Sequence, residues 1–469
     1  MMPTHLPVLG PLILSLGGGT GMLAAALALP VAAQPATARL DELIAARVQG
    51  DRSNVCVQAA RIDLNATPSV TTASGCASPR PDAPATDARF EIGSISKGFV
   101  GLLAAEMVAR GELKLDEPLS ALLPAGVQAP QFDGKPITVA DLLTHTAGLP
   151  PLPPRLGPGV DPANPYARLR DDVLYDGLAA VKLAAAPGTR YAYSNWAFLM
   201  LSDLLARRAG KPYDVLLTER VLAPLGMKDT LVARNDRLVR GRMANGVATP
   251  NWDVPVAYAG AGGLRSTLDD LVKLARAMLG EVPESVPASL RSALTRAPTR
   301  LRDGPPGVAV AMAWHLRQRP AGSPFVFHNG MTGGFSSMLL LDPATRRAAI
   351  TLADAAGGFD DLALYLLDPK VPLAAPRRAV SLDLPAAQAA AGRYELQPGF
   401  VLTLTVDDGK LYAQATGQGR FELLQDSRGD YYALVADILV RMQRAPDGKA
   451  SALTLFQGGG ALPAKRLGD

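Results

Sequence analysis

The sequence predicts an α+β fold, in which a mixed antiparallel sheet is flanked by helices and an all-helical lobe, and a small antiparallel barrel-like β-domain follows. Strand patterns lie at both ends of residues 34–370 and enclose a helix-rich block from about 138 to 280. The Pro-rich stretch 371–385 is typical of a linker. Residues 386–469 contain short alternating strands with hairpin turns at "DDGK" and "PDGK".

Residues 1–33 have the pattern of an export signal. No Asp, Glu, Lys or Arg occurs from Met1 to Ala38, and the apolar run "MLAAALALPVAA" leads to small residues ahead of Gln34. The basic residues that usually open such a signal are missing, so a retained membrane anchor facing the periplasm is the alternative to a cleaved signal peptide. Both alternatives predict a periplasmic protein. The segment "GGGTG" lacks the Gly-Lys-Ser/Thr of a phosphate loop.

Composition excludes several classes of function. The chain has 469 residues and is 48% hydrophobic, enough for a large core. Its 47 basic and 43 acidic residues give a net charge of only +4, without a dense basic run, so we expect no nucleic-acid partner. The isolated residues His5, His145, His315 and His328 do not have the spacing of metal ligands, so no metal is expected.

The strand-like segment near 54–75 carries both cysteines of the chain. Cys56 and Cys76 flank a predicted hairpin, and an oxidising periplasm would favour one disulfide between them. Two unpaired, half-buried thiols remain the alternative, because pairing geometry cannot be obtained from sequence.

A predicted helix begins within "FEIGSISKGFVGLLAAEMVARGEL", since apolar residues recur there at helical spacing until Gly111. Ser94 and Lys97 therefore lie one turn apart near the helix N-terminus. A lysine that burial deprotonates can activate a serine, and a free N–H at the helix start can hold an oxyanion. By itself, S-x-x-K is a weak signal, because most such pairs are an N-cap serine beside a surface lysine.

Three further segments follow in the chain. They are "LLTHTAGLP" (Leu142–Pro150), "YSN" (Tyr193–Asn195) ahead of a helix that ends at Gly210, and "HNG" (His328–Gly330) in a strand. Tyr193 alone would suit core packing, and Asn195 alone a helix N-cap. We expect His145 to be a framework residue satisfied by backbone and His315 to be a strand residue near the core. No G-x-S-x-G motif of an α/β-hydrolase occurs.

In this order, S-x-x-K, Y-x-N and H-x-G resemble the serine β-lactamase and penicillin-binding-protein superfamily, specifically its class C β-lactamase-like branch with D,D-carboxypeptidases and esterases. The resemblance covers roughly residues 40–370, and the C-terminal segment is similar to a small β-domain that some members carry. It implies that Ser94 forms an acyl-enzyme and that Lys97 takes or shares its proton. It also implies that Tyr193 relays protons and activates water for deacylation, coupled to Lys97.

The same resemblance implies substrate contacts. Asn195 would hold a substrate amide, His328 and Gly330 would line the site, and the N–H groups of Ser94 and Met331 would form the oxyanion hole. Where many β-lactamases have the lysine of K-T-G, this chain has His328, and an ordinary histidine is mostly neutral at pH 7. Strong β-lactam hydrolysis is therefore not expected; a D,D-peptidase or a hydrolase of neutral esters is.

The predicted function is an exported serine hydrolase acting through a Ser acyl-enzyme on D-alanyl peptides or β-lactams. One alternative is an esterase for short acyl esters with the same Ser-Lys-Tyr site, and the other is a non-catalytic penicillin-binding or sensor protein. The expected partner is a small-molecule or peptide substrate, with no cofactor. Membrane contact is expected only if the N-terminal segment is retained.

Overall fold

The computed structural model describes residues 39–49, 55–156, 160–161, 163–233, 237–243, 246–320, 322–374, 377–397, 400–416, 419–434, 438–445, 450–457 and 460–467. The predicted signal segment 1–33 and the predicted turn "PDGK" lie outside these residues. Within them, no helix combines the length and the apolar character needed to cross a bilayer.

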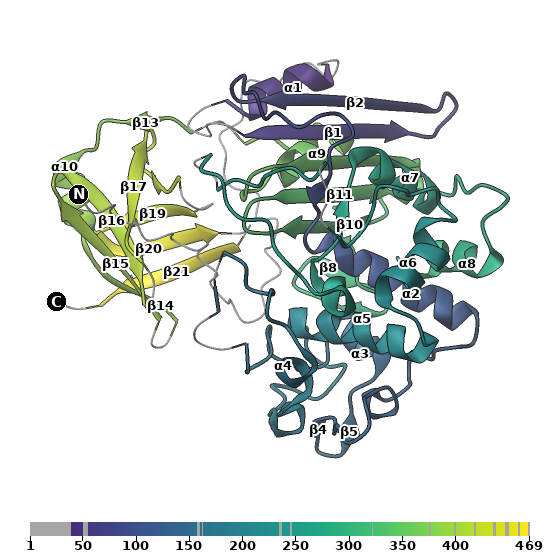
Figure 1. Ribbon diagram of the computed structural model, residues 1–469. Coiled ribbons are helices and arrows are strands. Elements are labelled where there is room, and N and C mark those ends of the chain that lie inside the picture. Colours follow the sequence, from purple (N-terminus) through teal and green to yellow (C-terminus); the bar gives the residue numbers. More distant parts are fainter. Residues whose placement is uncertain are drawn as a thin grey trace, which may run out of the picture.

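The main sheet contains eight antiparallel strands, and strands from both ends of the segment 39–374 meet in it (Figure 1). Val57 of β1 lies opposite Ala353 of β12, so the first and last strands of this sheet along the chain are neighbours. This arrangement confirms the predicted mixed fold. In spatial order the strands are β2 (Ser69–Cys76), β1 (Cys56–Asp63), β12 (Arg347–Ala353), β11 (Ser336–Asp342), β10 (Phe325–Met331), β9 (His315–Arg317), β8 (Val308–Val310) and β7 (Arg302–Asp303).

Both faces of this sheet are buried, because successive side chains of a strand point to opposite faces. In β11, Met338 and Leu340 join the core beneath α1 (Leu40–Arg47) and α9 (Asp360–Leu367), whereas Leu339 and Leu341 join the larger core on the opposite face. That second face is covered by α2 (Ile95–Ala109) and α7 (Leu268–Met278), and α8 (Ala288–Arg296) packs on α2 (Figure 1).

The helical lobe between the sheet strands is less regular than the sequence pattern suggests. Prolines such as Pro150, Pro151 and Pro153 cannot donate backbone hydrogen bonds, so the described residues between 144 and 170 form turns and irregular chain. The lobe holds the α-helices α3 (Val139–Leu143), α4 (Asp171–Tyr175), α5 (Asn195–Ala209) and α6 (Tyr213–Leu217), the π-helical turn Thr218–Leu222, and the 3-10 helices Leu119–Ala121, Leu178–Ala180 and Val256–Ala261.

Short strands and one turn complete this part of the fold. β3 (Phe90–Glu91) pairs with β6 (Arg265–Ser266), and this pairing holds the chain just ahead of α2 in place. β4 (Gln131–Phe132) and β5 (Lys135–Pro136) form a small hairpin. A further 3-10 turn, Pro343–Thr345, joins β11 to β12.

The C-terminal region forms a closed antiparallel barrel of eight strands, because β17 and β18 pair and join the two ends of the sheet (Figure 1). The predicted hairpin at "DDGK" is present, with Asp408 and Gly409 both at positive φ. The barrel elements are α10 (Leu384–Ala390), β14 (Gly392–Gln397), β15 (Phe400–Asp407), β16 (Lys410–Ala415), β17 (Phe421–Asp426), β18 (Tyr431–Tyr432), β19 (Ile438–Arg444), β20 (Ala450–Gln457) and β21 (Gly460–Arg466).

The stretch suggested as a linker, 371–385, contains secondary structure. Its β13 (Ala379–Val380) pairs with β17, and α10 begins inside it at Leu384. The short strand adds to the barrel wall, so the chain has joined the barrel before residue 386.

The two cysteines occupy directly opposed positions in the hairpin of β1 and β2. Cys56 and Cys76 are register partners, their Cα atoms are 4.0 Å apart, and a disulfide joins them. The Cys56 N–H donates to Asp354 Oδ1 at 2.7 Å, and Arg80 forms an ion pair with the same carboxylate. The hairpin at the sheet edge is thereby tied to the turn after β12.

Candidate active site

Ser94 is the N-cap residue of α2, and Lys97 lies in the first turn of that helix. The Lys97 side chain is completely buried, unlike that of a surface lysine. Its Nζ donates a hydrogen bond of 2.9 Å to Ser94 Oγ and a second one to the carbonyl oxygen of Ala261, in the 3-10 helix of the lobe. The S-x-x-K spacing thus produces a direct contact between a hydroxyl and a buried amine.

Tyr193 reaches the same hydroxyl from a different part of the chain. Its Oη donates to Ser94 Oγ at 2.9 Å, and Lys97 Nζ lies 5.0 Å from the centre of its ring. The tyrosine belongs to the extended segment immediately before α5, whose N-cap is Ser194. Ser94 Oγ therefore accepts hydrogen bonds from two groups that can each exchange a proton.

Burial shifts the pKa values of the Lys97 amine and the Tyr193 phenol. Loss of solvation lowers the pKa of Lys97 far below its ordinary value. Burial raises the pKa of Tyr193 well above that of a free phenol, although the hydrogen bond to Ser94 acts in the opposite direction. Both shifts favour the uncharged forms, namely an amine that can act as a base and a phenol that can donate a proton.

Two glycines allow β10 to lie against the loop that carries Ser94. A Cβ on Gly330 would be 2.0 Å from the carbonyl oxygen of Ile92, and a Cβ on Gly93 would be 2.6 Å from the nitrogen of Met331. Ser337 Oγ also donates to the Ile92 carbonyl, at 2.9 Å. Met331 ends β10 with 52% of its surface exposed. The backbone of Met331 consequently lies next to the residue preceding Ser94.

This close approach predicts that Gly330→Ala separates β10 from the Ser94 loop. The new methyl group would collide with backbone, so we expect a loss of about 1–3 kcal/mol in the free energy of unfolding and a slower reaction at Ser94. Thermal unfolding and the rate of covalent labelling of Ser94 measure the two effects. Gly409→Ala is the control, since open space surrounds Gly409; it should lose some stability and keep the labelling rate.

His328 lies in β10 and is 1% exposed. Its Nδ1 donates to the Asn329 carbonyl at 2.7 Å, and burial, together with the nearby His315 and Lys97, lowers its pKa far below the ordinary value. His315, at the start of β9, has its ring centre 5.1 Å from that of His328. The H-x-G motif of this chain therefore presents an uncharged imidazole.

The remaining candidate residues are Asn195 and His315. Asn195 is the first residue of α5, two residues after Tyr193, and is half-buried. His315 is buried, as expected, and its Nε2 lies 3.2 Å from Tyr191 Oη.

Two participants were missed by sequence reasoning. One is the carbonyl of Ala261, a backbone group that no side-chain pattern in the sequence indicates. The other is the contact of His145 with Tyr193: the two rings stack with their centres 4.3 Å apart. The expected backbone partner of His145 is present, because its Nδ1 accepts the Ser194 N–H, but the spacing of "THTAG" indicates no aromatic neighbour.

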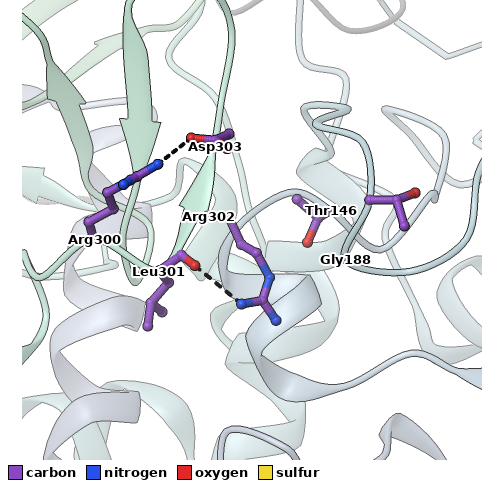
Figure 2. Close-up of a pocket in the computed structure, with 7 residues that line it drawn as sticks. Thr146, Gly188, Arg300, Leu301, Arg302 and Asp303 are labelled. Atoms are coloured by element: carbon purple, nitrogen blue, oxygen red, sulfur yellow. Dashed lines mark hydrogen bonds and ion pairs between the residues drawn. The ribbon is translucent and has the colours of Figure 1, made fainter.

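A separate cavity of about 400 Å³ does not include Ser94, Lys97 or Tyr193 in its lining (Figure 2). It is lined by Thr146, Gly188, Thr189 and residues 300–303. Its guanidinium groups already have partners: Arg300 donates to Asp303, and Arg302 donates to the Leu301 carbonyl. In the part of the chain that the structure describes, no group of His, Cys, Asp or Glu side chains is arranged to hold a metal ion.

The fold is that of the class C β-lactamases and D-alanine carboxypeptidases. Residues 63–368 match the model of the Beta-lactamase family. The chain belongs to that family.

Individual relatives differ in how much of the chain they match. The D-alanyl-D-alanine-carboxypeptidase/endopeptidase AmpH of Escherichia coli K12 is 36% identical over 192 residues, which are 40% of this chain and 49% of AmpH. The match thus spans about half the length of that relative. Penicillin-binding protein 4* of Bacillus subtilis is 24% identical over 414 residues, covering 81% of this chain and 88% of the relative.

Solved structures show the same fold. The β-lactamase/D-alanine carboxypeptidase of Yersinia pestis, in complex with citrate, is 26% identical with a TM-score of 0.54 and covers 65% of this chain and 88% of its own. The D-alanine carboxypeptidase AmpC of Burkholderia cenocepacia is 24% identical with a TM-score of 0.54, covering 67% and 93%.

Proposed function

We propose that the protein hydrolyses D-alanyl peptides or β-lactams through an acyl-enzyme on Ser94. The observation that carries the proposal is the pair of 2.9 Å hydrogen bonds that Ser94 Oγ accepts from Lys97 Nζ and Tyr193 Oη. Similarity to AmpH, whose name states D-alanyl-D-alanine carboxypeptidase activity, supports a D-alanyl peptide as the substrate.

Acylation begins with Lys97 as the base. In this step the Ser94 hydroxyl turns its hydrogen towards the lone pair of the neutral amine, which takes the proton while Oγ attacks the substrate carbonyl carbon. As the tetrahedral intermediate collapses, the carbonyl–nitrogen bond breaks, and the Tyr193 phenol gives its proton to the leaving nitrogen. The Lys97 ammonium then returns a proton to Tyr193, so both groups regain their starting states and Ser94 carries the acyl group.

The intermediate carries a negative oxygen that needs donors. The N–H groups of Ser94 and Met331 supply them in this proposal, and removing one such donor costs on the order of 100-fold or more in rate. The glycine contacts between β10 and the Ser94 loop support this role, since they bring the backbone of Met331 beside Gly93, the residue that precedes the nucleophile. Asn195, at the start of α5, would hold the amide of the acyl portion, and Gly330 would line the site where β10 lies against the Ser94 loop.

Deacylation uses the same two side chains to move protons, first away from water and then to Ser94. The Tyr193–Lys97 pair takes a proton from water, the hydroxide attacks the acyl carbonyl, and Ser94 Oγ leaves with a proton returned by the pair. Water thus replaces the leaving nitrogen, and the carboxylic acid departs.

A second candidate function, hydrolysis of short neutral esters, is favoured by His328. A lysine at that position would attract a substrate carboxylate, whereas the buried imidazole is uncharged at neutral pH. A substrate without a carboxylate would not need a lysine at this position, so His328 would not weaken its binding.

The place of action and the domain division are also proposals. We infer export to the periplasm, with residues 1–33 as a cleaved signal or an anchor, and the Cys56–Cys76 disulfide supports an oxidising compartment. We further propose a hydrolase domain over 34–370 and an accessory β-domain over 386–469; the closed barrel core, which contains its own buried residues, supports the second boundary.

The test is intact-protein mass spectrometry after incubation with benzylpenicillin, with Ser94→Ala as the control. An adduct that is absent from the control supports the acyl-enzyme, and turnover of a D-alanyl-D-alanine peptide in preference to p-nitrophenyl acetate supports the peptidase. Ester turnover alone would select the esterase. A parent protein that forms no adduct and hydrolyses none of these compounds would overturn the proposal and leave a binding or sensor protein.

A further inference from the structure

His145 occupies a backbone conformation that a residue with a side chain seldom adopts. It follows the C-cap of α3, where its φ is +57°. The Thr146 N–H bonds to the Asp141 carbonyl at 2.8 Å and the His145 N–H to the Leu142 carbonyl at 3.3 Å, which is the hydrogen-bond pattern of a Schellman motif. Glycine is the usual residue at this position, and α5 of the same chain uses Gly210 in the left-handed conformation at its end.

The histidine binds the chain on both sides of Tyr193. The Ala192 N–H donates to the His145 carbonyl at 2.7 Å, and the Ser194 N–H donates to His145 Nδ1 at 3.0 Å. Between these two bonds, the imidazole stacks on the Tyr193 ring with an interplanar angle of 28°. A single residue therefore holds the backbone before and after the tyrosine and one face of its ring.

The tautomer follows from these contacts. Nδ1 accepts a backbone N–H, so the neutral ring carries its proton on Nε2. The residue is 1% exposed and packs between Tyr193 and Phe198. A glycine would satisfy the backbone of the helix end but would provide neither the ring nor the acceptor.

We propose that His145 is a positioning residue, which fixes the Tyr193 hydroxyl on Ser94 Oγ by clamping the segment Ala192–Ser194. The proposal rests on the proposed function, because it assigns a catalytic consequence to that placement. The backbone strain at position 145 is then retained for the sake of the side chain rather than for the turn.

Kinetics of His145→Gly test the consequence for the reaction. Glycine relieves the left-handed strain, so the turn should form, while we expect kcat to fall on the order of 30- to 100-fold with KM changed by less than about threefold. Asparagine tolerates the same conformation, and its Oδ1 can accept the Ser194 N–H. The kcat of His145→Asn should therefore be about tenfold higher than that of His145→Gly. Leu142→Ala, which removes buried volume from the same helix and leaves the imidazole in place, is the matched control.

Two kinetic results would overturn the proposal: a kcat of His145→Gly within about threefold of the parent, or an equal loss in Leu142→Ala at a similar thermal midpoint. A crystal structure of His145→Gly decides the question independently of turnover. We expect the Tyr193 Oη to move out of hydrogen-bonding distance from Ser94 Oγ, and an unchanged contact would refute the positioning role even if the parent protein proved inactive. Inactivity of the parent itself would contradict the proposed function alone.

Discussion

Replacing Lys97 by methionine is expected to slow the acylation of Ser94 on the order of 1,000- to 10,000-fold, because the base that takes the hydroxyl proton is lost. The same change should stabilise the fold by about 1–2 kcal/mol at pH 7, since a buried amine is exchanged for an apolar chain of similar length. Stopped-flow acylation and chemical unfolding measure the two effects. A gain in stability together with a loss of activity is the signature of a residue kept for chemistry.

The pH dependence of this stability difference has a defined sign. The folded-state pKa of Lys97 lies far below its unfolded value of about 10.4, so unfolding takes up a proton at any pH between the two. Burial of the Lys97 amine lowers the free energy of unfolding by its full amount below the folded-state pKa, and this loss disappears as the pH rises towards about 10.4. The advantage of Lys97→Met should therefore be smaller at pH 10 than at pH 7.

The acylation rate of the parent should also depend on the protonation of Lys97, and it should rise with pH. Acylation should fall as the pH decreases through the folded pKa of Lys97, because the protonated amine cannot accept the Ser94 proton. Lys228→Met is the control, since Lys228 is exposed, and it should change the free energy of unfolding by no more than about 0.5 kcal/mol. A Lys97→Met protein that acylates at the parent rate would remove Lys97 from the mechanism.

The parts of the site that sequence predicts best are those fixed by local geometry. Ser94 and Lys97 meet because three residues make one helical turn, and their contact requires only that α2 begins where its apolar pattern begins. The hairpin that joins Cys56 to Cys76 likewise follows from alternation along neighbouring strands. The barrel turn at Asp408 and Gly409 follows from the preference of these residues for positive φ.

Contacts between distant segments could not be obtained in this way. Tyr193 and His328 were found through their motifs, yet no periodicity places a tyrosine 99 residues from Ser94 on its hydroxyl. The carbonyl of Ala261 is a backbone group, so its identity carries no chemical signal. His145 breaks the local rule that favours glycine at a left-handed helix end, and its reason lies in a tertiary contact.

The neutral character of the site connects these observations. Lys97, His145, His315 and His328 are all buried, and burial is the first cause of the lowered pKa of each. Lys97 also contributes to the lowered pKa values of the three histidines, and His315 contributes to those of His145 and His328. One proton delivered by Ser94 to Lys97 would consequently be held weakly and passed on readily, as a proton carrier requires.

Tyr193→Phe is expected to slow both acylation and deacylation, on the order of 100- to 1,000-fold, while leaving the fold intact. Phenylalanine keeps the ring that stacks on His145 and removes only the hydroxyl bonded to Ser94 Oγ. The raised pKa of Tyr193 makes this group a proton donor to the leaving nitrogen at neutral pH, so the loss should be greater for peptides than for esters with good leaving groups. Rates of formation and decay of the benzylpenicillin adduct, followed by mass spectrometry, separate the two steps.

Two features of the Tyr193→Phe protein distinguish a chemical role from a structural one. Its thermal midpoint should match that of the parent, and the acid limb of its residual acylation should persist, because that limb belongs to Lys97. An adduct that decays at the parent rate would show that water is activated elsewhere, since the proposed route to deacylation passes through the phenol. An equal loss for peptides and for activated esters would instead contradict proton donation to the leaving group, and would restrict Tyr193 to holding Ser94 in position.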